Sequence, residues 1–178
     1  MARNRFERLT PVDDDGRVRV VLESPQDSRN KLKYEPAIDA FEVSASLPAG
    51  MEFPFDFGSF PGTMAPDGDP LDCLVIMDGP AYPGVIVNVR LLGVIEAEQT
   101  DGESKPYRND RLIAVADGST ERGELRRLSD LDDALMTQIE SFFATYDRLT
   151  GKSFKPIARH GRRRARTLLD EATRTKHA

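Results

Sequence analysis

The 178-residue sequence contains one cysteine, Cys73, and no apolar stretch long enough to span a membrane. A single cysteine excludes an intramolecular disulfide and any metal site built from several thiolates. The first eight residues alternate charged and uncharged side chains instead of forming an apolar signal, so we expect a cytoplasmic protein with no membrane partner. A Gly-rich phosphate loop is also missing, which disfavours nucleotides as substrates. The formal net charge of -5 disfavours nucleic acid as a partner.

The strands that the sequence predicts are short and precede any clear helix. Residues 17–23 alternate apolar and polar side chains and end at Glu23, which lies on the face opposite the apolar set. Residues 96–110 are acid-rich and contain Gly102 and Pro106, so we expect a loop. Further strands are expected at residues 31–34, 40–47, 73–77, 85–95 and 111–116. This order, in a chain of a length that suits one domain over residues 1–178, predicts an α+β fold: a small closed β-barrel with helices added at the end.

One helix is expected over residues 131–149, where apolar side chains recur at intervals of three and four residues. Ser129 or Asp130 is its expected N-cap, and Gly151 ends the pattern. A second, shorter helix is expected through Leu168. Residues 162–164, all arginines, lie at its start, where their charge opposes the helix dipole; they are either solvated, which we favour, or they bind an anionic partner.

Four phenylalanines lie between residues 53 and 60, among turn-forming residues such as Pro54 and Gly58. Aromatic side chains at this spacing fill a core or line a pocket wall. Because phenylalanine has no hydroxyl group, these side chains cannot donate a hydrogen bond to a phosphate. We therefore expect them to shape a site without binding its charged ligand.

Three aspartates, Asp67, Asp69 and Asp72, fall within six residues directly before an apolar strand. In an extended chain Asp67 and Asp72 would stand about 17 Å apart, whereas Mg²⁺ is bound over about 2.1 Å. Gly68 and Pro70 favour a turn that gathers these carboxylates. At about 4 Å two such charges repel by roughly 4 kcal/mol, which a hard divalent cation would offset. The alternative is a turn whose acids only cap the backbone, and the spacing alone leaves both readings open.

Upstream of this turn, Lys33, Tyr34 and Glu35 form part of an expected strand. Side chains alternate along a strand, so Lys33 and Glu35 point to the same side. Taken alone, the two residues favour a surface ion pair over a binding site.

With the aspartate turn and the Lys33-Tyr34-Glu35 stretch in view, residues 15–155 resemble the soluble family I inorganic pyrophosphatases. Glu23, the aromatic stretch, the acidic loop and a late helix with Tyr146 follow in that family's order. The resemblance implies an OB-like barrel that hydrolyses pyrophosphate to two phosphates with three or four Mg²⁺ ions. It also implies a homo-oligomer, since the bacterial members are commonly hexamers.

The resemblance also implies a role for each matching residue. Asp69 would accept a proton from the attacking water. Three residues would bind phosphate: Lys33, Arg111 and Tyr146. The implied metal-binding residues are Asp67, Asp72, Asp101, Asp110, Glu23 and Glu35. Carboxylates supply the oxygen ligands that Mg²⁺ prefers, and a metal-activated water suits this hydrolysis.

The sequence departs from the family at several positions of the phosphate-binding half. Ser44, Ala45 and Ser46 stand where an arginine is usual, and Phe53 and Phe57 replace two tyrosines. Asp147 replaces a lysine after the late tyrosine. Alignment on Arg111 places Asn109 where the family has an aspartate. We expect the neighbouring Asp110 to bind the metal instead, because only a carboxylate carries the charge that the site needs. Residues 162–164 or another subunit are alternative sources of phosphate contacts.

Two other functions are compatible with these departures. The same site would act on another phosphoanhydride, such as a nucleoside triphosphate or a short polyphosphate. Alternatively, the protein is a catalytically weak barrel that binds phosphate or metal and serves as an interaction module. Hydrolysis of pyrophosphate remains the function that the most residues support.

Overall fold

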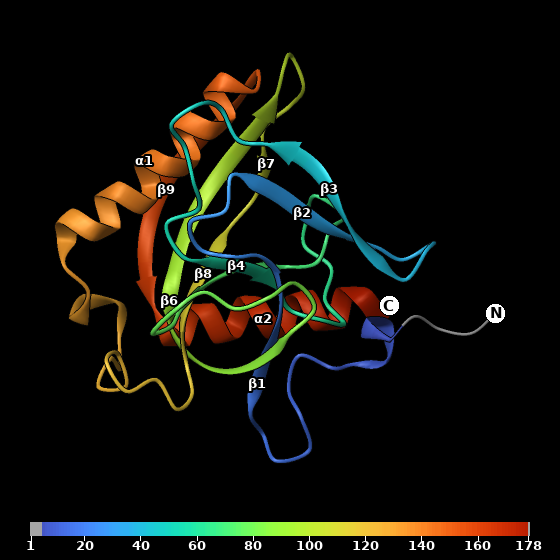
Figure 1. The fold of residues 1–178 in the computed structure, drawn as a ribbon, viewed down its shortest axis with the longest axis vertical. Helices are drawn as coiled ribbons and strands as arrows, with labels where there is room; N and C mark the ends of the chain where they lie inside the picture. Colours follow the sequence, from blue (N-terminus) through green and yellow to red (C-terminus); the bar gives the residue numbers. More distant parts are fainter. Residues whose placement is uncertain (1–4, 178) are drawn as a thin grey trace.

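The strands form a large sheet that closes into a ring and a separate hairpin, in a computed structural model that describes residues 5–177 (Figure 1). The large sheet has the order β1-β4-β5-β8-β6-β7, and β6 also pairs with β1 and with β9. The hairpin consists of β2 and β3. The strands are β1 (Val18–Ser24), β2 (Asn30–Glu35), β3 (Ala40–Ser46), β4 (Asp56–Ser59), β5 (Asp72–Ile76), β6 (Ile86–Asp101), β7 (Tyr107–Arg108), β8 (Arg111–Ala116) and β9 (Lys152–Gly161). The expected α+β class is confirmed, with the sheet ringed through the β1–β6 pairing.

The two expected helices are present as α1 (Asp133–Leu149) and α2 (Arg162–His177). Short 3-10 turns occur at Phe6–Arg8 and Leu128–Asp130. The predicted N-cap of the first helix was wrong, because that second turn occupies the position. Asp132 caps α1 instead, where its Oδ1 accepts a hydrogen bond of 2.8 Å from the Ala134 amide.

The prediction of a loop over residues 96–110 was wrong for residues 96–101 and for Tyr107–Arg108, which are strand residues. Strand β6 continues through this stretch to Asp101, because β9 pairs with it from Gly93 to Asp101. The sequence pattern predicts neither β9 nor the short strands β4 and β7. A strand partner far along the chain thus holds acidic residues in the sheet that, taken locally, favour a loop.

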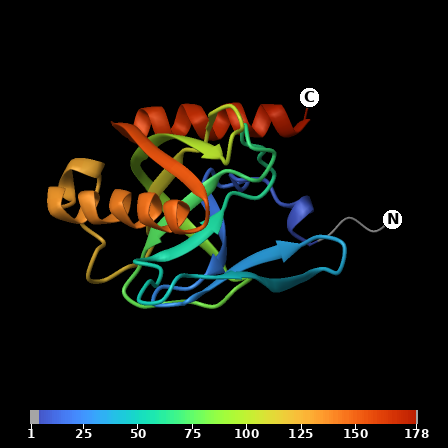
Figure 2. The ribbon, with the colours of Figure 1, turned by 90° about the horizontal axis from the view of Figure 1, so that it is seen from above.

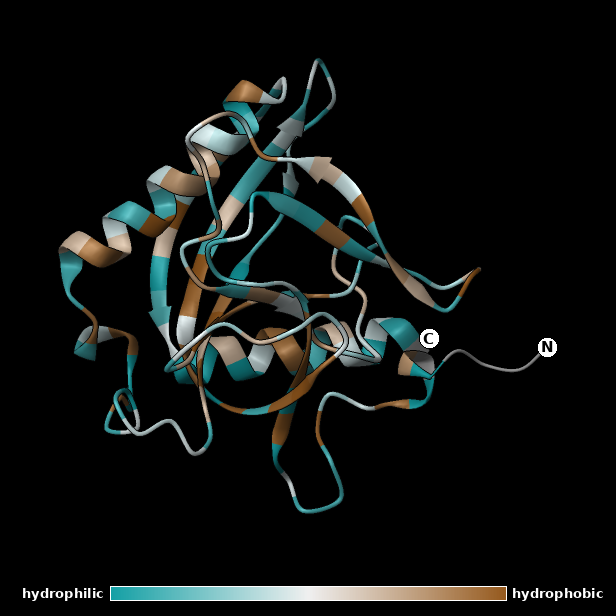
Figure 3. Ribbon diagram, viewed as in Figure 1, coloured by the Kyte–Doolittle hydropathy of each residue, from teal (hydrophilic) through white to brown (hydrophobic). Residues whose placement is uncertain are grey.

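The core is divided into two clusters, each covered by one helix. The buried residues Ala165 and Leu169 of α2 pack with the first cluster, and Ile139 and Phe143 of α1 pack with the second. Apolar and polar residues alternate along α1, as the spacing predicts (Figure 3). The β2–β3 hairpin projects on the side of the ring opposite α2 (Figure 2). Within residues 5–177, no helix is both long and apolar enough to cross a membrane.

Gly58 sets the distance between β4 and β1. A Cβ atom at this position would collide with the backbone oxygen of Val21 and stand 3.0 Å from the Leu22 Cα. We expect the G58A substitution to lower the free energy of unfolding by about 1–3 kcal/mol, because two paired backbones must separate. The matched control is G79A, which meets no atom within 4 Å and should shift stability by less than about 0.5 kcal/mol. Urea denaturation measures both, and equal midpoints would contradict the prediction.

Candidate active site

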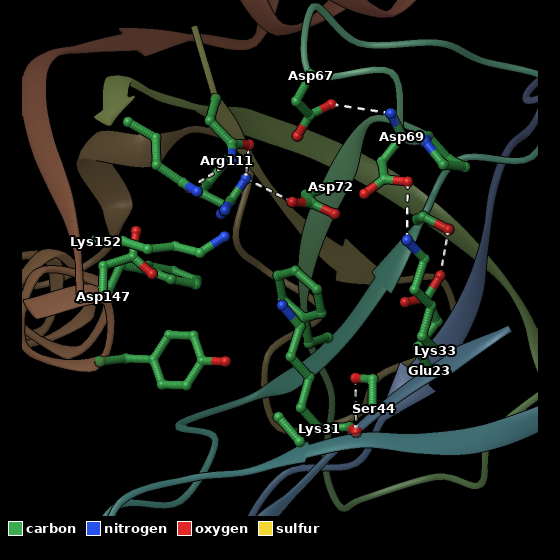
Figure 4. A pocket seen from close by; sticks show the side chains of 18 of the residues that line it. Glu23, Lys31, Lys33, Ser44, Asp67, Asp69, Asp72, Arg111, Asp147 and Lys152 are labelled. Carbon is green, nitrogen blue, oxygen red and sulfur yellow. Dashed lines mark hydrogen bonds and ion pairs between the residues drawn. The ribbon is translucent and has the colours of Figure 1, made fainter. Parts of the chain in front are cut away.

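A cavity of about 440 Å³ opens where the ring, the β2–β3 hairpin and α1 meet (Figure 4). Its lining combines six carboxylates with four cations. The carboxylates are Glu23, Asp67, Asp69, Asp72, Asp101 and Asp147, and the cations are Lys31, Lys33, Arg111 and Lys152. A concave site with this many charges is suited to a small, highly charged ligand.

Strand register places several of these polar residues at one level of the ring. Ser59 of β4 stands opposite Asp72 of β5, and Asp72 stands beside Arg111 of the parallel strand β8. Glu23 belongs to an irregular step in the pairing of β1 with β4, between Leu22 and Ser24. Such a bulge re-aims a side chain, and here the Ser59 hydroxyl donates a 2.7 Å hydrogen bond to Glu23 Oε1.

Arg111 is held between a carboxylate and an aromatic wall. Its Nη1 lies 2.5 Å from Asp72 Oδ2 and also donates to Asn109 Oδ1. The guanidinium carbon lies 5.1 Å from the ring centre of Phe143 and 5.6 Å from that of Phe154. The residue is buried, and among residues 5–177 its Nε has no hydrogen-bond partner. Arg111 is therefore fixed in orientation at the cavity wall.

The aspartate stretch forms the turn that its composition predicts. The Asp69 amide donates a 3.1 Å hydrogen bond to Asp67 Oδ1, and Gly68 adopts a φ of 87° that favours glycine. Lys33 reaches across from β2, with its Nζ 2.9 Å from Asp69 Oδ1. The turn thus brings both carboxylates into the cavity lining, where Lys33 compensates one of them.

The far wall is built by the paired strands β6 and β9. Asp101 stands opposite Lys152 in the register, and Lys152 Nζ lies 3.3 Å from Asp101 Oδ2. Gln99 donates to Asp101 Oδ1 over 3.0 Å and to the Tyr107 hydroxyl over 2.6 Å. Asn109 in turn donates to Gln99 Oε1 over 2.7 Å. This network fixes the position of Asp101.

Burial raises the pKa of four carboxyl groups in the cavity. It raises that of Glu23 to about 7, although the Ser59 hydrogen bond opposes the shift. The pKa values of Asp67, Asp72 and Asp147 are also raised by burial. Asp101 differs, since the hydrogen bond from Gln99 lowers its pKa. Burial therefore favours the uncharged form of these four carboxyl groups, and a cation placed beside them would favour the charged form.

The donor set fits a divalent cation in its chemistry. Carboxylate oxygens are the ligands that Mg²⁺ prefers, and burial makes each unneutralised carboxylate costly. Among residues 5–177, no three Asp, Glu, His or Cys side chains already converge as an ion site. Asp69, Asp72 and Asp101 instead pair with Lys33, Arg111 and Lys152. A cation would exchange some of these ion pairs for metal bonds.

Two of the predicted site residues lie outside the cavity lining. Glu35 accepts a 2.9 Å hydrogen bond from the Ala37 amide in its own hairpin turn. Asp110 is paired with Arg108 at 2.7 Å, and Asn109 occupies the cavity side instead. The choice of Asp110 over Asn109 is thus not supported by its placement, because alternation along the chain directs neighbouring side chains to opposite faces.

The remaining predicted residues all line the cavity: Asp69, Lys33, Arg111, Tyr146, Asp67, Asp72, Asp101 and Glu23. Phe53 and Phe57 line it too, as expected of a pocket wall. The cavity lining does not include Arg162, Arg163 or Arg164. Arg164 instead forms an ion pair of 2.6 Å with Glu96.

Sequence reasoning did not assign a role to Lys31, Lys152 or Asp147, which also line the cavity. The alternation that placed Lys33 on one face of β2 places Lys31 there as well, so that signal was present. Lys152 belongs to the unpredicted strand β9. Asp147 is 5% exposed, and its Oδ2 lacks a hydrogen-bond partner in the described part of the chain. No local sequence pattern reveals either property.

Comparisons with known proteins show which family this chain resembles. The family model described as "Inorganic pyrophosphatase" matches residues 20–177. The inorganic pyrophosphatase of Thermus thermophilus is 33% identical over 154 residues, covering 86% of this chain and 85% of its own. That of a Nostoc species is 28% identical over 94% of this chain and 96% of its own.

Solved structures show the same likeness. A crystal structure of inorganic pyrophosphatase from Thermus thermophilus superposes with a TM-score of 0.88 at 29% identity, covering 97% of this chain and 99% of that one. The enzyme from Neisseria gonorrhoeae gives 0.86, with the same identity and coverage.

The raised pKa of Glu23 predicts how metal-free protein responds to pH. The folded protein holds a proton on Glu23 up to about pH 7, whereas the unfolded chain loses it near 4.5. The free energy of unfolding should therefore fall as pH rises between these values. Above pH 7 the free energy of unfolding of the E23Q variant should be about 3 kcal/mol higher than that of the parent.

Urea denaturation in the presence of a chelator, repeated across this pH range, measures the difference. The matched control is E42Q, an exposed carboxylate on β3. Parallel profiles for E23Q and the parent would show that Glu23 titrates normally.

Proposed function

The chain belongs to the family I inorganic pyrophosphatases and hydrolyses inorganic pyrophosphate, and on that premise we propose that the charged cavity is its active site. The observation that carries the proposal is the convergence of six carboxylates and four cations in one cavity. Carboxylates suit the metal ions of such an enzyme, and cations suit the phosphate groups of the substrate. Members of this family generally use a divalent metal.

We propose Mg²⁺ as that metal, held by Asp67, Asp72, Asp101 and Glu23. When bound, the metal lowers the pKa of a coordinated water and shields the charge of the substrate. The carboxylates come from the aspartate turn, the start of β5, the end of β6 and the bulge of β1. Glu35 and Asp110 stand apart from this set, because their carboxylates bond to the hairpin turn and to Arg108.

Asp69 is the proposed proton acceptor. Its side chain is 56% exposed to the cavity opening, and its Oδ1 pairs with Lys33. When Lys33 turns to a phosphate oxygen, the carboxylate of Asp69 is released to accept a proton from water. Substrate binding and activation of the base are thereby linked through one lysine.

Arg111 and Tyr146 complete the proposed phosphate contacts. The guanidinium group of Arg111 lies against aromatic rings, where water is excluded and charge interactions are stronger. Burial raises the pKa of the Tyr146 hydroxyl, which keeps it protonated as a donor. Both side chains are held in place before substrate arrives.

We further propose that the protein is a homo-oligomer, a hexamer by resemblance to bacterial members of the family. Large apolar side chains that remain exposed in one chain support an additional interface. Examples are Ile38, Val43 and Tyr82, which are at least half exposed. The cytoplasm is the proposed compartment, where a free thiol such as that of the buried Cys73 stays reduced.

The D69N substitution tests the proposed base. We expect turnover of pyrophosphate to fall about 100- to 10,000-fold, because water loses its proton acceptor. Binding of Mg²⁺, measured by calorimetry, should change little. The matched control is D14N, an exposed aspartate outside the cavity.

The assay is phosphate release from pyrophosphate with Mg²⁺ titrated from zero and ATP tested in parallel. Activity should require the metal and strongly prefer pyrophosphate. Full turnover by D69N would remove Asp69 from the mechanism, and equal use of ATP would point to a broader phosphoanhydride hydrolase.

A further inference from the structure

The four cations that line the cavity differ in their partners. Lys33 pairs with Asp69 at 2.9 Å, Arg111 with Asp72 at 2.5 Å and Lys152 with Asp101 at 3.3 Å. Lys31 lines the same cavity and, within residues 5–177, has no carboxylate within ion-pair distance. Its charge is therefore the one among these four that no carboxylate pairs with directly.

The hairpin directs the Lys31 side chain into the cavity. Successive side chains along a strand point to opposite faces, so Lys31 and Lys33 lie on the same face of β2. The register between β2 and β3 shifts just after Lys31, and Ser44 is the extra residue on β3. The Ser44 hydroxyl donates a 3.1 Å hydrogen bond to the Lys31 carbonyl. In Figure 4 the side chain extends from β2 toward the centre of the cavity.

The Nζ of Lys31 is held over an aromatic ring. It lies 5.7 Å from the ring centre of Tyr146, which projects from α1 on the other side of the cavity. A cation above an aromatic face is attracted to the ring but keeps all three of its N–H donors. Lys31 is thus positioned without its hydrogen-bonding capacity being used.

The neighbouring strand supplies no cation to this wall. Ala45 stands directly opposite Lys31, and Ser44 and Ala45 both line the cavity. Lys33, two residues along β2, is engaged with Asp69. An anionic group that enters beside the hairpin would therefore meet Lys31 as its unpaired cationic partner.

We propose that Lys31 is a further substrate-binding residue, which binds oxygens of one phosphate group of pyrophosphate beside the β2–β3 hairpin. The inference rests on the proposal that this cavity is the active site. Lys31 supplies a cation on the hairpin wall where Ser44 and Ala45 carry none, while Arg111 supplies one on the opposite wall. The two phosphate groups of the substrate are thereby held from two sides.

The K31M substitution tests this role, because methionine keeps an unbranched side chain of similar length but removes the charge. We expect the KM for pyrophosphate and the Kd for inorganic phosphate to rise about tenfold or more, as for a lost charge-assisted hydrogen bond. K31R should restore both to within about threefold, since it keeps the charge. The matched control is K155M, an exposed lysine on β9 outside the cavity.

Steady-state kinetics with saturating Mg²⁺ and calorimetric titration of phosphate give these values, and thermal unfolding reports stability. Unchanged KM and Kd in K31M would overturn the proposal. An equal loss in K31M and K31R would also overturn it, since shape rather than charge would then matter. If D69N abolishes turnover while K31M has no effect, only the Lys31 inference fails. If neither substitution changes turnover, KM or the Kd for phosphate, the assignment of the cavity as the active site fails.

Discussion

The ion pair between Asp72 and Arg111 is the interaction on which the site depends. The two residues stand side by side on the parallel strands β5 and β8, and both begin their strands. Their contact of 2.5 Å is formed where the ring is lined by aromatic side chains, which restrict water. Breaking one partner of such a pair would leave a buried charge without compensation. The pairing of β5 with β8 therefore determines which charged side chains meet in the site.

From this pair the site extends around the ring in both directions. On one side, Asp72 stands opposite Ser59 of β4, which is hydrogen-bonded to Glu23 of β1. On the other side, Arg111 is hydrogen-bonded to Asn109, which is hydrogen-bonded to Gln99 near the end of β6. Each step is a neighbouring strand or a hydrogen bond between side chains. The fold thus brings residues from separate parts of the chain to one end of the ring, where α1 closes the cavity.

The charges of the cavity are distributed in a way that local sequence does not suggest. β3 contributes no cation, but Lys31 on its partner strand does. Asn109 carries no charge on the far wall, whereas α1 contributes the buried carboxylate of Asp147. Charges of the same sign can be supplied from different elements as long as they reach the same cavity, because Coulomb interactions depend on distance and burial rather than on chain position.

The sequence by itself determined the features that near neighbours control. Gly68 and Pro70 predicted the aspartate turn, alternation of apolar and polar side chains predicted β1, and three- and four-residue spacing predicted α1. The tertiary structure alone decided the pairing of β9 with β6, which extended β6 through its acidic end and brought Lys152 to Asp101. It also decided that Asn109 rather than Asp110 faces the cavity and that Glu35 does not. Backbone preferences act over a few residues, whereas strand register is set by packing between segments that lie far apart in the chain.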